Sequence, residues 1–122
     1  MNFYIANSLD EVTWGENVEI TEDVMHYISA KANYTDAKGL YFPEEFHALF
    51  VIDPYDDHLC SIKEMKELLN LCDFILTTDV LDGYEDWEEG NSNEEVDFIF
   101  SELKKLILEA FSVGKHIFSV GD

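Results

Sequence analysis

The chain has 122 residues, of which 47% are hydrophobic and 14% are aromatic, and a chain of this size buries roughly two thirds of its unfolded surface in one core. It carries 27 acidic residues against 7 lysines, contains no arginine and has a formal net charge of −20. This charge excludes nucleic-acid binding by phosphate neutralisation, which needs a Lys/Arg surface. It also disfavours docking to an anionic membrane.

The chain has no stretch that approaches the roughly 20 apolar residues of a membrane-spanning helix. Its N-terminal segment MNFYIANSLDE lacks the basic start and the apolar run of a signal peptide. We therefore expect a cytoplasmic protein. The two cysteines, Cys60 and Cys72, are flanked by apolar residues of a predicted helix or its entry, which favours buried free thiols over a disulfide.

The first third of the chain predicts two short strands, Asn2–Ala6 and Asn17–Ile20, followed by a helix. Thr21 is the expected N-cap of this helix, which ends before Gly39. Its apolar stripe begins with Val24, Tyr27 and Ile28 and runs toward Tyr34.

The run Phe46–Ile52 (FHALFVI) is almost continuously apolar and rich in aromatic and β-branched residues. Such a run is typical of a buried strand, and it predicts the central strand of a sheet. The turn-forming residues 53–57 (DPYDD) stop it.

Two long helices follow, each with a capping box at its start. Ser61 and Glu64 begin the first, which keeps helical spacing to Ile75 or Leu76. An alternative starts a strand at residues 73–76, because β-favouring residues are frequent there: Phe74, Ile75, Thr77, Thr78 and Val80.

Ser92 and Glu95 begin the second helix, whose apolar face continues for about four turns to Phe111. Gly114 is its expected C-terminal stop, and His116–Val120 is a closing strand. The alternation of strands and helices predicts an α/β fold: a single compact domain over residues 1–122, with a small sheet packed against about three helices.

The sequence contains no motif that indicates catalysis. The four histidines are scattered, and no nucleophile, dinucleotide-binding or phosphate-binding motif is present. Pairs of carboxylates arise by chance in a chain this acidic, and the lack of arginine removes the usual clamp for anionic substrates. We therefore predict no catalytic residue and no cofactor.

Candidate metal ligands lie close together at Asp53, Asp56, Asp57 and His58, and hard cations take oxygen ligands. Their spacing is not the alternating pattern that wraps calcium. We interpret Asp53 as part of a strand-ending turn and Asp56 and Asp57 as facing water, with weak adventitious calcium or magnesium binding left open. No metal site is predicted.

Residues 79–97, here called the acidic tract, contain nine acidic and no basic residues. Placing like charges close together lowers the stability of the fold through repulsion. We therefore infer that a role other than stability accounts for the acidic tract. Aromatic residues among carboxylates are typical of an interface anchor with a charged rim. We predict an interface for a basic protein at Asp79, Asp82, Tyr84, Glu85, Asp86, Trp87, Glu88, Glu89, Glu94, Glu95 and Asp97. A solvated face is the alternative.

The chain resembles the small acidic immunity proteins of bacterial polymorphic toxin and contact-dependent growth inhibition systems. The resemblance rests on length, a predicted α/β domain, the tract DVLDGYEDWEEGNSNEEVD, and the segment GLYFPEEFHALFVIDPYDD before a capped helix. It implies a cytoplasmic protein that binds one cognate basic toxin domain, often a nuclease, and blocks it without catalysis. The expected partner is neither a nucleic acid nor a membrane.

Three other functions remain open from the sequence. A nucleic-acid mimic would use the same negative field to inhibit several DNA- or RNA-binding proteins. An uncharacterised small enzyme would need a pocket with perturbed carboxylates or histidines. An acidic subunit of an oligomer would use exposed apolar surface for self-association.

Overall fold

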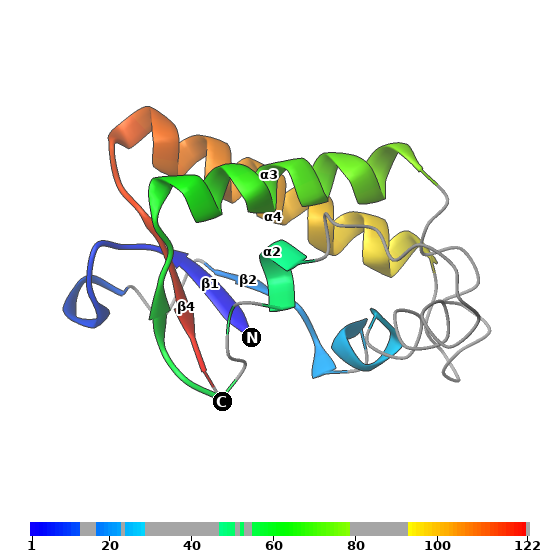
Figure 1. The fold of residues 1–122 in the computed structure, drawn as a ribbon, viewed down its shortest axis with the longest axis horizontal. Coiled ribbons are helices and arrows are strands. Elements are labelled where there is room, and N and C mark those ends of the chain that lie inside the picture. The colour runs from blue at the N-terminus through cyan, green and yellow to red at the C-terminus, as the bar shows by residue number, and fades with distance from the viewer. Residues whose placement is uncertain are drawn as a thin grey trace.

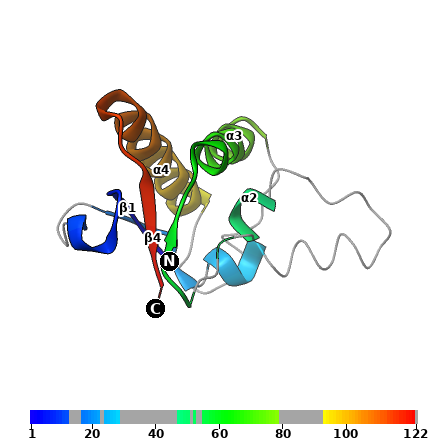
Figure 2. The same ribbon diagram turned by 60° about the vertical axis from the view of Figure 1, so that its left-hand side comes forward.

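A computed structural model describes residues 1–12, 17–22, 24–28, 47–50, 52, 55–78 and 93–121. These residues form an antiparallel sheet with two long helices lying side by side over it (Figures 1 and 2). The predicted α/β fold, a small sheet packed against helices, is confirmed.

The sheet consists of β1 (Asn2–Ile5), β2 (Val18–Glu19), β3 (His58–Leu59) and β4 (Ile117–Val120). Its order is β2-β1-β4-β3, and every neighbouring pair is antiparallel. The two central strands therefore come from opposite ends of the described chain. Strands were predicted in all of these places except β3, whose two residues are too few to show an alternating pattern.

The two faces of the sheet are both buried. Phe3 and Ile117 face the helices and are fully buried in the main core. Tyr4 and Phe118, which are paired across β1 and β4, point to the other face. There they pack with Val12, which follows the short 3-10 helix η1 (Leu9–Glu11).

Helix α3 (Ile62–Thr77) begins with the predicted capping box. The Glu64 backbone N–H donates to Ser61 Oγ at 3.1 Å, and the Ser61 backbone N–H donates to Glu64 Oε1 at 2.9 Å. Two of the otherwise unpaired N–H groups of the first turn are thereby satisfied, which fixes where the helix starts.

The C-terminal turn of α3 shows that the alternative strand at residues 73–76 is wrong. The hydroxyls of Thr77 and Thr78 donate to the carbonyls of Asp73 and Phe74, each at 2.6 Å. Ile75 is buried on the same helical face as Met65, Leu68, Leu71 and Cys72. The β-favouring side chains are accommodated in a helix because core packing outweighs their intrinsic preference.

Helix α4 (Asn93–Val113) runs antiparallel to α3, and an ion pair between Lys104 Nζ and Asp73 Oδ1, at 2.6 Å, joins the two. Its predicted apolar face is confirmed, with Val96, Ile99, Phe100, Leu103, Ile107 and Ala110 buried. Gly114 stops the helix with a φ of +70°, and the Lys115 N–H donates to the Ala110 carbonyl at 2.9 Å. The predicted cap Ser92 lies outside the described residues.

The prediction of a central strand at Phe46–Ile52 is wrong. The segment contains helix α2 (His47–Phe50), which packs against α3 with Ala48 and Leu49 buried (Figure 1). A short, continuously apolar run shows no periodicity, so a buried strand and a buried helical turn have the same pattern. The central positions of the sheet belong instead to β1 and β4.

The helix predicted after β2 is present where the structure describes it. Residues 24–28 are helical, and the Val24 N–H donates to Thr21 Oγ1 at 3.4 Å, as expected for an N-cap. Its predicted continuation toward Tyr34 and Gly39 lies outside the described residues.

Replacing the N-cap of α3 tests its contribution to stability. We expect Ser61→Ala to lower the free energy of unfolding by about 1 kcal/mol, because it leaves the Glu64 N–H without its acceptor. Urea denaturation measures the change. Ser112→Ala is the control: Ser112 is exposed in the last turn of α4, and its replacement should change stability by less than about 0.5 kcal/mol. Equal effects of the two substitutions would show that the capping box is unimportant.

Candidate functional site

The structure describes one end of the acidic tract. Glu94, Glu95 and Asp97 lie in the first turns of α4, and Glu94 and Asp97 are exposed. The other predicted contact residues lie outside the described residues: Asp79, Asp82, Tyr84, Glu85, Asp86, Trp87, Glu88 and Glu89. Negative charge at this end of α4 is favoured by the helix dipole, so these carboxylates are compatible with the helix they begin.

Phe98 is a large aromatic residue on the solvent side of α4, and its exposed fraction is 66%. At 3.6 residues per turn it points away from the buried face formed by Val96 and Phe100. Phe98 is not among the contact residues predicted from the sequence. A phenylalanine out of phase with the apolar stripe of an otherwise regular amphipathic helix was the pattern that could have identified it.

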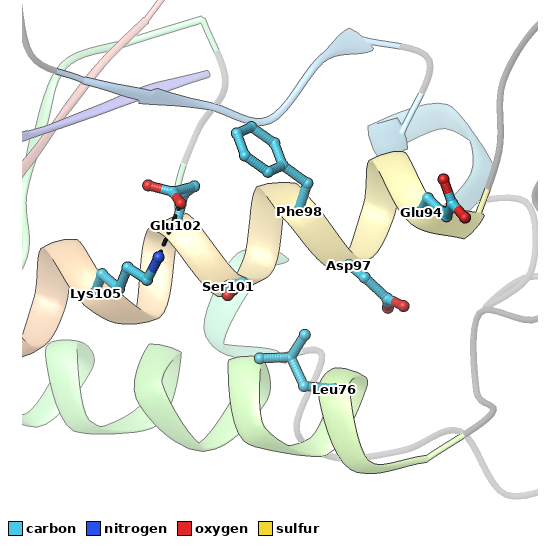
Figure 3. Close-up of a pocket in the computed structure, with 7 residues that line it drawn as sticks. All are labelled: Leu76, Glu94, Asp97, Phe98, Ser101, Glu102 and Lys105. Carbon is cyan, nitrogen blue, oxygen red and sulfur yellow. Dashed lines mark hydrogen bonds and ion pairs between the residues drawn. The ribbon is translucent and has the colours of Figure 1, made fainter.

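Phe98 borders an open hollow of about 540 Å³. Here the Phe98 surface means the residues that line this hollow: Leu76, Glu94, Asp97, Phe98, Ser101, Glu102 and Lys105. Figure 3 shows Leu76 reaching from α3 toward α4 and Asp97 on the side of α4 that faces α3, while Phe98 projects on the other side.

The antiparallel arrangement of α3 and α4 brings the end of α3 and the start of α4 to this hollow. Leu76 precedes residues 79–92 closely and Glu94 follows them closely, and both line the Phe98 surface. Residues 79–92, which the structure does not describe, thus lie in the sequence between two residues that line the Phe98 surface. The predicted contact residues before position 93 and the described residues at the start of α4 are thus continuous in sequence.

The Phe98 surface is predominantly negative. It contains the carboxylates of Glu94, Asp97 and Glu102 but one ammonium group, that of Lys105. Lys105 Nζ lies 3.2 Å from Glu102 Oε1. Within the part of the chain that the structure describes, neither Glu94 nor Asp97 forms an ion pair. An apolar ring beside carboxylates that outnumber the nearby cations is suited to binding a cationic group.

A second group of polar side chains lies where β3 meets α3. His58 Nε2 is 2.8 Å from Glu64 Oε2, and His58 is paired with Ser119 across β3 and β4. Ser119 is fully buried, and its Oγ has no hydrogen-bond partner among the described residues. Solvent does not reach Ser119, so this serine is not accessible to a substrate, whereas His58 and Glu64 are partly exposed.

The pKa of Glu64 reflects its structural role. Partial burial acts to raise the pKa, but hydrogen bonds from Ser61 and from His58, together with the charge of protonated His58, hold it below the usual value of 4.5. Glu64 thus joins the start of α3 to the edge strand β3 as a carboxylate.

The residues considered for a metal have structural contacts instead. Asp57 Oδ1 accepts a hydrogen bond from the Gly121 N–H at 3.1 Å, and Asp56 Oδ1 accepts one from the Asp57 N–H at 2.9 Å. His58 contacts Glu64, and Asp53 lies outside the described residues. In the ranges that are described, no three His, Cys, Asp or Glu side chains are grouped so that they could hold a metal ion.

Both cysteines are free and buried, as predicted. Burial, with the nearby carboxylates of Glu64 and Asp73 adding to it, raises the pKa of the Cys60 and Cys72 thiols to about 12. Neither thiol therefore has the thiolate character of a reactive cysteine. Searching the described helices for one that is both long enough and apolar enough to cross a bilayer finds none.

Comparison of the chain with protein-family models, with curated proteins and with solved structures finds no match. Three features of the molecule bear on function: the exposed ring of Phe98, the carboxylates around it, and the acidic tract that adjoins them.

The lowered pKa of Glu64 leads to a prediction about pH. A carboxylate with a depressed pKa in the folded state stabilises that state above the unfolded pKa, here 4.5, and the stabilisation is lost as the pH falls through the lower folded pKa. Glu64→Gln keeps a capping side chain but cannot ionise. Urea denaturation should show the variant to be less stable than the parent at neutral pH, with the difference shrinking as the pH falls below 4.5. A difference that is independent of pH would contradict this account.

Proposed function

We propose that the chain is an immunity protein that binds a cognate basic toxin domain and occludes its active or substrate-binding surface without catalysis. The observation that carries this proposal is the exposed Phe98 with Glu94 and Glu102 on either side of it along α4, next to the acidic tract. The resemblance to acidic immunity proteins supports the same class of partner.

An exposed aromatic ring of this kind is unfavourable in an isolated protein and favourable in a complex. Phe98 exposes 66% of its surface, and removing such a ring from water gives much of the affinity at typical protein interfaces. Charged residues around a buried aromatic anchor form the rim that excludes water and selects the partner. Glu94 and Glu102, which share the side of α4 from which Phe98 projects, are placed to form such a rim.

The net charge of −20 supplies the long-range attraction in this mechanism. A nuclease must present a basic surface to phosphates, and opposite charge on an inhibitor raises the association rate to about 10⁸ M⁻¹s⁻¹ or faster. Rapid capture protects the cell that makes the toxin. The place of this capture is the cytoplasm, where a nuclease toxin would reach its nucleic-acid substrate.

Co-expression tests the proposed function directly. The proposal predicts that the gene immediately upstream encodes a large secreted protein, and the basic C-terminal domain of that protein is the partner to use. Cells should survive production of that domain when this chain is co-expressed, and the two proteins should purify as a stable complex. Failure to protect would contradict the immunity function. Competition with DNA on several unrelated basic proteins would indicate a nucleic-acid mimic instead.

Charge reversal at the described end of the acidic tract tests the interface. Glu94→Lys with Asp97→Lys changes two exposed carboxylates beside Phe98. We expect the association rate with the toxin domain to fall by at least tenfold at low salt and its salt dependence to weaken, because attraction near the contact is lost. Stopped-flow mixing at several salt concentrations measures both quantities.

A matched variant separates local from global charge effects. Asp10→Lys with Glu109→Lys makes the same change in net charge at exposed positions of η1 and of the C-terminal half of α4. It should slow association far less. Reversal of Asp86, Glu88 and Glu89 to lysine tests the rest of the acidic tract in the same assay. If none of these variants differs from the matched control, the predicted surface is not the interface.

A further inference from the structure

We propose that the Phe98 surface receives an arginine side chain of the partner, with the guanidinium stacked on the Phe98 ring between Glu94 and Glu102. This inference rests on the proposed function and specifies the chemistry of its contact. The group that binds at this site is a planar cation carried by a basic protein.

The spacing along α4 places a carboxylate on each side of the ring. Glu94, Phe98 and Glu102 follow one another at intervals of four residues, so each carboxylate is about 6 Å from the ring position along the helix axis. Side chains at this spacing share one helical face. Figure 3 shows Glu94 and Glu102 on either side of Phe98 along α4.

Lys105 shows that this face already attracts a cation. Its ammonium lies 3.2 Å from Glu102 Oε1, yet the Lys105 side chain remains 71% exposed. A solvent-exposed ion pair of this kind contributes little to stability, so a cation from outside can displace it at small cost. Glu94 has no such internal cation among the described residues.

Arginine fits these groups better than the other side chains of a protein partner. Its guanidinium is planar and weakly hydrated, stacks on aromatic rings and donates several N–H groups in one plane. A carboxylate on each side of the ring can accept those N–H groups. A purely apolar side chain would bury Glu94 and Glu102 without a partner, and a lysine ammonium is strongly hydrated and has no flat face to stack.

The test uses the full chain and two peptides of equal length and charge, hexa-arginine and hexa-lysine, at low ionic strength. Hexa-arginine should bind more tightly. Phe98→Leu keeps an apolar side chain but removes the aromatic face, and it should weaken hexa-arginine binding by about two- to fivefold while leaving hexa-lysine binding nearly unchanged. Phe98→Tyr retains the ring and should bind both peptides as the parent does. Isothermal titration calorimetry measures the affinity of each protein for each peptide.

The flanking carboxylates have a matched control on the same helix. Glu94→Gln and Glu109→Gln remove the same charge from exposed positions, but Glu109 lies about three turns from Phe98. Glu94→Gln should reduce the preference for hexa-arginine over hexa-lysine, and Glu109→Gln should leave it unchanged. Because Phe98, Glu94 and Glu109 are exposed, circular dichroism should show all these variants to be folded.

The outcomes separate this inference from the proposed function. If the toxin domain and both peptides bind but Phe98→Leu changes neither peptide affinity, or changes both equally, the arginine site is wrong and the proposed function stands. If the chain fails to bind any cationic protein or peptide, both proposals fail.

Discussion

Burial of one face of α4 is the constraint on which the rest of the structure depends. Phe100, Leu103 and Ile107 are fully buried between α3 and the sheet, and α4 contacts α3, β1 and β2. This packing fixes the rotation of α4 about its axis, because turning the helix would expose those side chains to water. With the rotation fixed, Phe98 must face solvent. The candidate site is thus a consequence of the core: the packing that hides one aromatic residue of α4 exposes another.

Much of the fold could be predicted from the sequence because its elements carry strong local patterns. The capping box of Ser61 and Glu64, the regular apolar stripe of α4 and the stop at Gly114 all appear in the structure. The prediction at Phe46–Ile52 was wrong because a short apolar run has no period by which a strand differs from a helix. Strand β3 was missed because it forms through pairing with β4, a tertiary contact without a local pattern.

The candidate site was predictable to a smaller extent. The acidic tract was identified from its charge, and Glu94, Glu95 and Asp97 lie at the start of α4. Leu76 joins them only because α3 and α4 are antiparallel, and no local pattern links residue 76 to residue 94. Phe98 required the rotation of α4 to be known, since an aromatic residue in an amphipathic helix is more often part of the core. Charge is therefore readable from composition, whereas the apolar component of the surface depends on packing.

The sheet order β2-β1-β4-β3 places the last described strand between the first and the third. Asn2 pairs with Val120, so the middle of the sheet joins residues separated by almost the whole chain. A nascent polypeptide cannot complete this sheet until residues 117–120 have left the ribosome. Before then Phe3 and Tyr4 lack their main neighbours from β4, and an unpaired strand of this kind is prone to wrong association. The sheet is thus completed only after β4 has emerged, and pairing strands so distant in sequence carries a larger loop-closure cost than pairing neighbours.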